Sequence, residues 1–183
     1  MPSSFHGHIS DVIDIYLKAN PLTVLDVGVG YGKWGTLFRE YGDVFKGRLK
    51  PEEWRVSIHG VEIFENYYNL NYDQSYTQVF FESIVDFLNK GHNIPEYDFI
   101  YAGDVIEHLD KKTALNVINK FKIISKTLAI SIPLTDRWPQ GEIFGNEHEA
   151  HKSIWEEKDF TGLFANKKIY TNPAGKLIGL FYG

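Results

Sequence analysis

A cluster of glycines near the N-terminus restricts the folds open to this chain. The stretch VLDVGVGYGKWG, residues 24–35, holds Gly28, Gly30, Gly32 and Gly35 directly behind a short apolar run. Glycine inside a helix or strand costs roughly 0.5–1 kcal/mol relative to alanine, so the cluster predicts a tight backbone turn. The apolar run predicts a buried strand, and the residues after the glycines predict a helix. Together they predict a loop where a ligand approaches backbone N–H groups at a helix N-terminus.

The rest of the chain alternates between strand-like and helix-like patterns. Helices are predicted at 10–19, 33–41, 83–91, 112–125 and 156–164, and strands at 23–27, 55–63, 77–81, 97–102, 127–134, 167–171 and 176–182. This alternation predicts a three-layer, doubly wound α/β fold with a mostly parallel seven-stranded sheet. The turn NPAG at 172–175 predicts an antiparallel C-terminal hairpin. Ligands of such sheets bind at the carboxyl ends of the strands.

Composition narrows the class of protein. The 183 residues are 43% hydrophobic, which suits one domain over 1–183 with a sizeable core. The N-terminus lacks the regions of a signal peptide and the apolar runs are too short to cross a bilayer, so we expect a cytoplasmic protein with no membrane partner. A net charge of −5 argues against a general electrostatic affinity for the nucleic-acid backbone. The absence of cysteine excludes disulfides, thiolate metal sites and cysteine nucleophiles.

Two common phosphate-binding motifs do not fit the glycine loop. A dinucleotide fingerprint needs a third glycine where Lys33 stands, and a P-loop needs Ser or Thr where Trp34 stands. The remaining pattern is D-x-G-x-G-x-G, formed by Asp26 and the first three glycines. This pattern resembles motif I of the class I S-adenosylmethionine-dependent methyltransferases.

The resemblance continues along nearly the whole chain. IHGVEIFENY (58–67) is similar to the second motif of that family, YDFIYAGDVIEHLDK (97–111) to its fourth-strand segment, and TLAISIPL (127–134) to its fifth strand. The closing hairpin is similar to the family's reversed last strand. The resemblance implies a Rossmann-like methyltransferase fold with S-adenosyl-L-methionine as cofactor.

The resemblance also implies a set of cofactor-binding residues. The methionyl portion is expected at Asp26, Gly28, Gly30, Gly32, Gly103 and Asp104, the ribose at Glu62, and the adenine at Ser83 and Ile84. The methionyl amine and ribose hydroxyls are donors that carboxylates can accept, and the cofactor carries no phosphate that would need a lysine. The family often places an acidic residue beside the adenine, for which Glu82 or Asp86 could substitute.

Carboxylates and histidines gather after the fourth and fifth predicted strands. Asp104, Glu107 and His108 would share one face of a helical turn, and 145–160 adds His151 among other acidic and histidine residues. Such side chains suit a divalent ion. The pattern resembles the metal site of small-RNA 3′-end 2′-O-methyltransferases, which implies Asp104, Glu107, His108 and His151 as ligands of Mg²⁺, Mn²⁺ or Fe²⁺. Without a metal, His108 or His151 could act as general base, since an ordinary histidine has a pKa of about 6.5.

The sequence therefore supports a main function and alternatives to it. The main hypothesis is methyl transfer to a hydroxyl of a small molecule, with Glu107, His108 and His151 as candidate catalytic residues. The alternatives are metal-assisted methylation of an RNA or sugar hydroxyl, a non-catalytic cofactor-binding partner subunit, and histidines that only line the pocket. Substrate specificity is expected from 42–54 and 134–155, and His8 is expected to face solvent.

Overall fold

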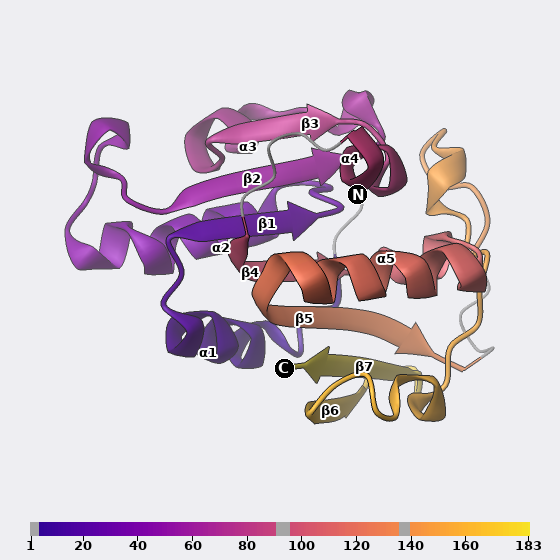
Figure 1. The fold of residues 1–183 in the computed structure, drawn as a ribbon. Coiled ribbons are helices and arrows are strands. Elements are labelled where there is room, and N and C mark those ends of the chain that lie inside the picture. The colour runs from indigo at the N-terminus through magenta and orange to yellow at the C-terminus, as the bar shows by residue number, and fades with distance from the viewer. Residues whose placement is uncertain (1–3, 91–95, 136–139) are drawn as a thin grey trace.

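A seven-stranded mixed sheet forms the centre of the computed structural model, which describes residues 4–90, 96–135 and 140–183 (Figure 1). The strands are β1 (Thr23–Val27), β2 (Ser57–Glu62), β3 (Gln78–Phe81), β4 (Tyr97–Gly103), β5 (Ser125–Leu134), β6 (Asn166–Thr171) and β7 (Leu177–Tyr182). Their order is β3-β2-β1-β4-β5-β7-β6. The first five strands pair in parallel, whereas β7 runs antiparallel to both β5 and β6. The predicted sheet and its C-terminal hairpin are confirmed.

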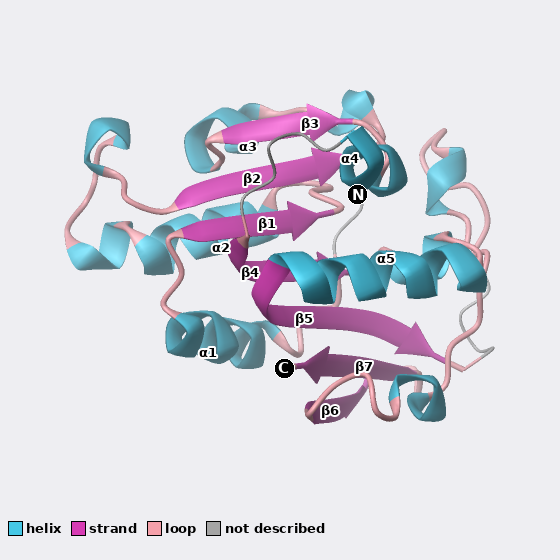
Figure 2. Ribbon diagram, viewed as in Figure 1, coloured by secondary structure: helices cyan, strands magenta, loops and turns pink. Residues whose placement is uncertain are grey.

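Helices cover both faces of the sheet (Figure 2). They are α1 (Ile9–Ala19), α2 (Lys33–Gly42), α3 (Leu70–Ser75), α4 (Ile84–Lys90) and α5 (Lys111–Ile124). Buried side chains form two hydrophobic clusters, one on each face of the sheet. The clusters contain Phe38 of α2 on one face and Phe87 of α4 with Phe121 of α5 on the other. This three-layer packing is the predicted doubly wound arrangement.

The helices depart from the prediction chiefly at 156–164 and at α3. The predicted helix 83–91 is α4, and Gly91 lies outside the described residues. The predicted helix 156–164 is only a 3-10 turn over Glu157–Phe160, because Gly162 adopts a left-handed φ of 80°. Helix α3 was not predicted; its start is fixed by the Asn69 side chain, which accepts a hydrogen bond from the Asn71 N–H.

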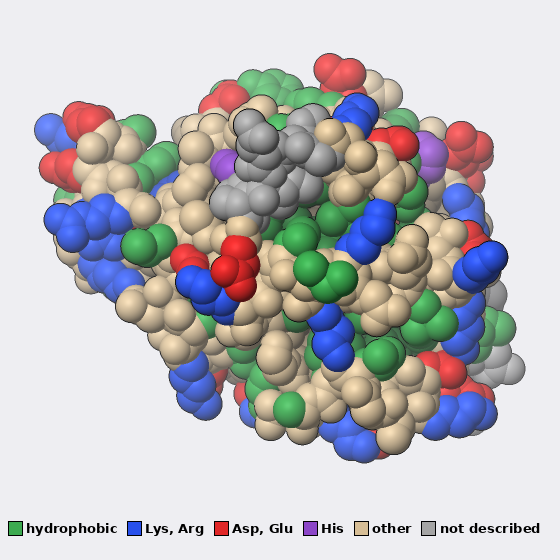
Figure 3. Space-filling view, in the orientation of Figure 1, with side chains coloured by type: hydrophobic (Ala, Val, Ile, Leu, Met, Phe, Trp, Pro, Cys, Tyr) green, Lys and Arg blue, Asp and Glu red, His purple; other side chains and the backbone are tan. Residues whose placement is uncertain are grey.

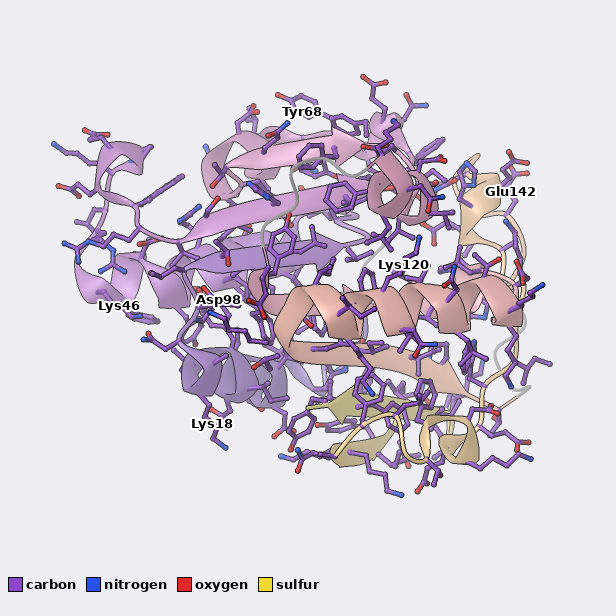
Figure 4. All side chains as sticks on the ribbon, viewed as in Figure 1. Lys18, Lys46, Tyr68, Asp98, Lys120 and Glu142 are labelled. Atoms are coloured by element: carbon purple, nitrogen blue, oxygen red, sulfur yellow. The ribbon has the colours of Figure 1, made fainter. Side chains whose placement is uncertain are left out.

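Hydrogen bonds to Asp98 connect the amino ends of the strands, and the loop that carries Glu142 lies at the opposite end of the sheet. At the amino ends, the Asp98 carboxylate accepts hydrogen bonds from the backbone N–H groups of Leu22 and Thr23 and from Nζ of Lys126. The loop that carries Glu142 lies at the opposite end, beyond the carboxyl ends of the strands (Figure 4). Among the described residues, no helix is both long and apolar enough to span a bilayer.

The segment 42–54 lies at the amino-end side of the sheet, where it protrudes to the left in Figure 1. Helix α2 starts at the carboxyl ends and runs back, so an insertion after its last turn must emerge at the opposite end. The buried carboxylate of Asp43 holds the insertion by pairing with Arg39 and Arg48 and accepting from the Arg55 N–H. The expectation that 42–54 helps to determine substrate specificity is therefore wrong for the cavity described below.

Candidate cofactor and catalytic site

The glycine loop between β1 and α2 is held by bonds to the end of β2. The N–H of Gly28 donates to the Val61 carbonyl oxygen at 2.8 Å, and the N–H of Gly30 donates to Oε2 of Glu62 at 2.9 Å. Gly28 has a φ of 75°, and a Cβ there would lie 2.3 Å from Cγ2 of Val105. The loop therefore requires glycine at this position.

Asp26 supports the glycine loop through a buried chain of hydrogen bonds. Its carboxylate accepts a hydrogen bond from the Tyr76 hydroxyl, which in turn accepts one from the Gly35 N–H at 3.0 Å. Burial raises the pKa of Asp26 to about 7, although the Tyr76 hydrogen bond opposes this shift. Its side chain is buried beneath the loop and does not line the cavity beside it.

A cavity of about 410 Å³ lies at the carboxyl ends of β1, β2 and β4. Nine of the predicted site residues line it: Gly28, Gly30, Glu62, Ile84, Gly103, Asp104, Glu107, His108 and His151. Three others, Asp26, Gly32 and Ser83, do not. The Ser83 hydroxyl instead donates to Asp86 at 2.6 Å at the start of α4. Of the two acidic substitutes, Glu82 lines the cavity and Asp86 does not.

Glu62 is fixed in position at the end of β2. Its Oε2 accepts from the Gly30 N–H and its Oε1 accepts from the Phe64 N–H, each at 2.9 Å. Burial raises the pKa of Glu62, and these backbone hydrogen bonds oppose that shift. A carboxylate held in this way is preorganised to accept further hydrogen bonds from a ligand in the cavity.

Asp104 follows β4 in a strained conformation. Its φ of 55° is left-handed, which is uncommon outside glycine and is often found at functional sites. Oδ2 of Asp104 accepts a hydrogen bond from the Phe5 N–H at 3.2 Å. Burial raises the pKa of Asp104. The hydrogen bond from Phe5 and the positive charge of Lys33 oppose this shift.

The N-terminal segment closes one side of the cavity, with Ser4 and Phe5 in its wall. His8 follows and is fully buried, with Nε2 at 3.0 Å from the Tyr101 hydroxyl. Burial lowers the pKa of His8 to about 4. The prediction that His8 faces solvent is wrong, because its ring also stacks on the buried indole of Trp34.

Three of the four predicted metal ligands lie together. Glu107, His108 and His151 each offer one ligand atom, and these atoms lie within 4.8 Å of one another. Asp104 is not in this group. The segment forms a 3-10 turn over Ile106–His108 rather than an α-helical turn, so the predicted common face with Asp104 does not form.

The protonation of the cluster follows from its contacts. Nδ1 of His108 lies 3.2 Å from the Ala150 carbonyl oxygen, which can only accept, so a neutral His108 carries its proton on Nδ1. Burial lowers the pKa of His108, which favours this neutral form with a lone pair on Nε2. Burial also raises the pKa of Glu107, and no described residue forms a hydrogen bond with its Oε2. Oε1 of Glu107 lies 4.0 Å from Nε2 of His151.

The segment after β5 forms a roof over the cavity. Its Lys152 and Ser153 N–H groups donate to the Glu107 carbonyl oxygen at 2.8 and 3.1 Å. On the other side of the cavity, the Tyr67 hydroxyl donates to Oε1 of Glu149 at 2.9 Å. Sequence reasoning missed Tyr67 and Lys33 as lining residues; the only signal for Lys33 was its place directly after the third glycine of the loop.

No protein-family model matches the sequence, and no curated protein sequence is significantly similar to it. Solved structures are similar in fold. TehB from Haemophilus influenzae has a TM-score of 0.65 at 15% identity, over 99% of this chain and 62% of that one. A SAM-dependent methyltransferase from Archaeoglobus fulgidus has a TM-score of 0.64 at 14% identity, over 96% of this chain and 90% of that one. The present chain thus spans less than two thirds of the TehB chain.

A third structure was solved with ligands. The 1,6-didemethyltoxoflavin-N1-methyltransferase from Burkholderia thailandensis, with bound 1,6-didemethyltoxoflavin and S-adenosylhomocysteine, has a TM-score of 0.62 at 14% identity. The match covers 96% of this chain and 82% of that one. Together with the strand order and the reversed β7, these similarities show that the chain has the Rossmann-like fold of class I S-adenosylmethionine-dependent methyltransferases.

Proposed function

We propose that residues 1–183 act as one domain that transfers a methyl group from S-adenosyl-L-methionine to a hydroxyl of a small molecule. The observation that carries this proposal is a single cavity that joins the glycine loop and Glu62 to the cluster of Glu107, His108 and His151. When bound, the cofactor supplies an electrophilic methyl group. The chain would supply positioning and a base, which are the main sources of rate in such transfers.

Each end of the cavity has a separate task in this proposal. Gly28, Gly30 and Ile84 would shape the cofactor pocket, and Glu62 would accept hydrogen bonds from the ribose hydroxyls. His108 would take the acceptor proton on Nε2, because its Nδ1 proton is directed at the Ala150 carbonyl. Burial lowers the pKa of His108 and so favours the neutral ring. Glu107 would orient His151, whose ring lies 5.1 Å from that of His108.

A small acceptor fits the surroundings of the cavity. Residues of the described segment 140–152 and the N-terminal residues Ser4 and Phe5 form part of its wall. On the face drawn in Figure 3, cationic side chains gather at the left edge and are otherwise mixed with anionic ones. The left edge is the amino-end side of the sheet, so this cationic group does not surround the cavity, where a nucleic-acid acceptor would need positive charge.

Methyl transfer to a panel of phenols, catechols and sugar alcohols tests the proposal, with radiolabelled S-adenosyl-L-methionine as donor. His108→Ala should lower kcat by about 10²–10⁴, the usual loss for a general base. His148→Ala is the matched control, because His148 also lines the cavity but lies outside the cluster, and it should change kcat little. A wild-type chain that binds the cofactor and methylates nothing in the panel would favour a non-catalytic binding subunit.

The histidine cluster favours a second candidate, metal-assisted methylation of an RNA or sugar hydroxyl. One carboxylate and two imidazoles fit a first-row divalent ion, and no residue in the described part of the chain binds the buried Oε2 of Glu107 and would compete with the ion. Glu107, His108 and His151 would hold the ion, which would supply Lewis-acid polarisation of the acceptor hydroxyl. Titration of Mn²⁺ into the protein tests this: binding that is lost in His151→Ala supports a metal, and no binding by the wild type excludes Mn²⁺ as the ion.

A further inference from the structure

Apolar side chains protrude into solvent from the insertion after α2. The exposed fractions of Phe45 and Leu49 are both 68%, and that of Val44 is 37%. All three lie in the segment 44–50, VFKGRLK, which also holds three cationic residues and no acidic one. The cavity lies at the opposite end of the sheet, so the proposed methyl transfer does not account for this surface (Figure 1).

Buried polar contacts hold the first half of the segment in place. The carboxylate of Asp43 is buried and accepts hydrogen bonds from Nε of Arg48 at 2.6 Å and from the Arg55 N–H at 2.9 Å. The Arg48 N–H also donates to the Asp43 carbonyl oxygen at 3.1 Å, and between them Gly47 has a left-handed φ of 78°. The turn is therefore tied at its base, which keeps its apolar side chains away from the core.

The second half of the segment is held by another carboxylate. Oε2 of Glu53 accepts from the Leu49 N–H at 3.0 Å and from the Lys50 N–H at 3.1 Å, just before the 3-10 turn Pro51–Glu53. Leu49 and Lys50 are themselves exposed. Asp43 and Glu53 thus bind groups of the insertion, and the segment between them presents cationic and apolar side chains to solvent.

Further cationic charge lies beside the segment. Nζ of Lys46 donates to Oδ1 of Asn20 at 3.2 Å, which brings the end of α1 next to the insertion. Lys18 of α1 is exposed, as are Lys46 and Lys50, and Figure 4 places Lys18 and Lys46 on the same side of the molecule. A cationic group is visible at this edge in Figure 3.

This combination of side chains suits the interface of an anionic bilayer. Apolar side chains gain free energy when they leave water for the boundary between headgroups and acyl chains, and lysines are attracted to anionic headgroups. Phe45 and Leu49 lie on a protruding turn, which can enter a deformable lipid interface. A protein partner would instead need a groove that matches the turn, and a nucleic-acid backbone would leave Leu49 in water.

We propose that residues 44–50 form a peripheral contact with an anionic lipid surface. Phe45 and Leu49 would enter the interface, and Lys46 and Lys50 would lie at the headgroups. The expectation of no membrane partner rests on the lack of a run that could cross a bilayer, and a peripheral contact needs no such run. The contact would leave the cavity at the far end of the sheet open to solution, and it does not depend on the proposed function.

Cosedimentation of the full chain with lipid vesicles tests the role of charge. The wild type should bind vesicles of phosphatidylcholine and phosphatidylserine about tenfold or more tightly than vesicles of phosphatidylcholine alone. Lys46→Gln combined with Lys50→Gln should lose most of this preference. Lys112→Gln combined with Lys158→Gln is the matched control, because it removes the same charge from exposed positions outside the insertion, and it should keep the preference.

A second pair of double variants tests entry of the apolar side chains. Phe45→Ser combined with Leu49→Ser should weaken binding to the anionic vesicles about tenfold or more, because two apolar side chains no longer leave water. Leu70→Ser combined with Ile154→Ser is the matched control, since these side chains are 72% and 59% exposed and lie outside the insertion. It should bind as the wild type does. Urea unfolding at the wild-type midpoint shows that each variant keeps its fold.

No binding to anionic vesicles, or equal binding to both kinds of vesicle, would overturn the lipid contact. Equal losses in a variant and its matched control would overturn its assignment to residues 44–50. Unchanged binding after Phe45→Ser with Leu49→Ser would overturn the entry of these side chains into the interface. Retention on immobilised polyglutamate or on an RNA oligonucleotide, without binding to vesicles, would indicate a protein or a nucleic acid in place of lipid.

Discussion

The Tyr76 hydroxyl donates a hydrogen bond to the buried carboxylate of Asp26 beneath the glycine loop. The same hydroxyl accepts from the Gly35 N–H in the first turn of α2. All three residues are buried, so this contact ties β1 and α2 to the segment that precedes β3. The loop that we assign to the cofactor thus rests on a polar contact closed off from water.

Removal of this hydroxyl should destabilise the protein. Tyr76→Phe removes the buried hydrogen bonds of the hydroxyl with the Asp26 carboxylate and the Gly35 N–H, which costs about 1–3 kcal/mol of unfolding free energy. Tyr68→Phe is the matched control, because the exposed Tyr68 hydroxyl donates to the nearby Asp73 and its loss should cost under about 0.5 kcal/mol. Urea unfolding measures both values. Equal stabilities of the two variants would contradict the supporting role of Tyr76.

Asp26 should make stability depend on pH. Its pKa rises from about 3.9 in the unfolded chain to about 7 in the fold, so folding favours the protonated acid. The resulting stabilisation is complete below about pH 4 and is lost as the pH rises through about 7. Relative to Asp26→Asn, the wild type should lose up to about 1.4 kcal/mol per pH unit over this range.

The difference between the two proteins isolates Asp26 from other titrating groups. Urea unfolding of the wild type and Asp26→Asn at about pH 5 and about pH 8 measures it. A difference that stays constant, or that grows in favour of the wild type at the higher pH, would contradict the buried acid.

Two glycines with similar backbone angles should respond differently to alanine. Gly28 and Gly47 have φ values of 75° and 78°, but a new Cβ at Gly28 would lie 2.3 Å from Cγ2 of Val105, whereas no described atom lies within 4 Å of a Cβ at Gly47. Each variant should lose about 1 kcal/mol of unfolding free energy, because alanine is less stable than glycine in a left-handed backbone conformation. Gly28→Ala should also weaken S-adenosylhomocysteine binding, and Val105→Ala in the same chain should restore part of it. Calorimetric titration of S-adenosylhomocysteine into the three variants tests this. Equal binding by Gly28→Ala and Gly47→Ala would contradict a loop that has no room for a Cβ at Gly28.

The sheet could be predicted because its strands are encoded locally. β4 is buried at every position except Asp98, so it is a continuous apolar run in the sequence, and its bounds differ from the prediction by one residue. Helix α3 has six residues with two buried positions, Tyr72 and Ser75, and offers no repeating pattern. Its position depends on the Asn69 cap and on packing against α2, which local sequence does not show.

The candidate site also contains residues that local sequence patterns indicate and residues that such patterns do not indicate. Gly28, Gly30 and Glu62 belong to motifs that the sequence shares with a known family, and the structure places all three in the cavity wall. His8 was misplaced because its burial depends on Tyr101, which comes from a distant strand. Lys33 was overlooked because a cofactor without phosphate gives no reason for a lysine, and its partner Asp104 is brought near only by the fold.

Glu62 gives the most direct test of the account. Calorimetric titration of S-adenosylhomocysteine into the wild type, Glu62→Gln and the exposed control Glu65→Gln compares three chains of the same size. Loss of the charged acceptor should weaken binding about tenfold or more in Glu62→Gln and leave Glu65→Gln unchanged. That result would place the cofactor at the carboxyl end of β2. Equal affinities in all three, or no binding by the wild type, would contradict a methyltransferase site in this cavity.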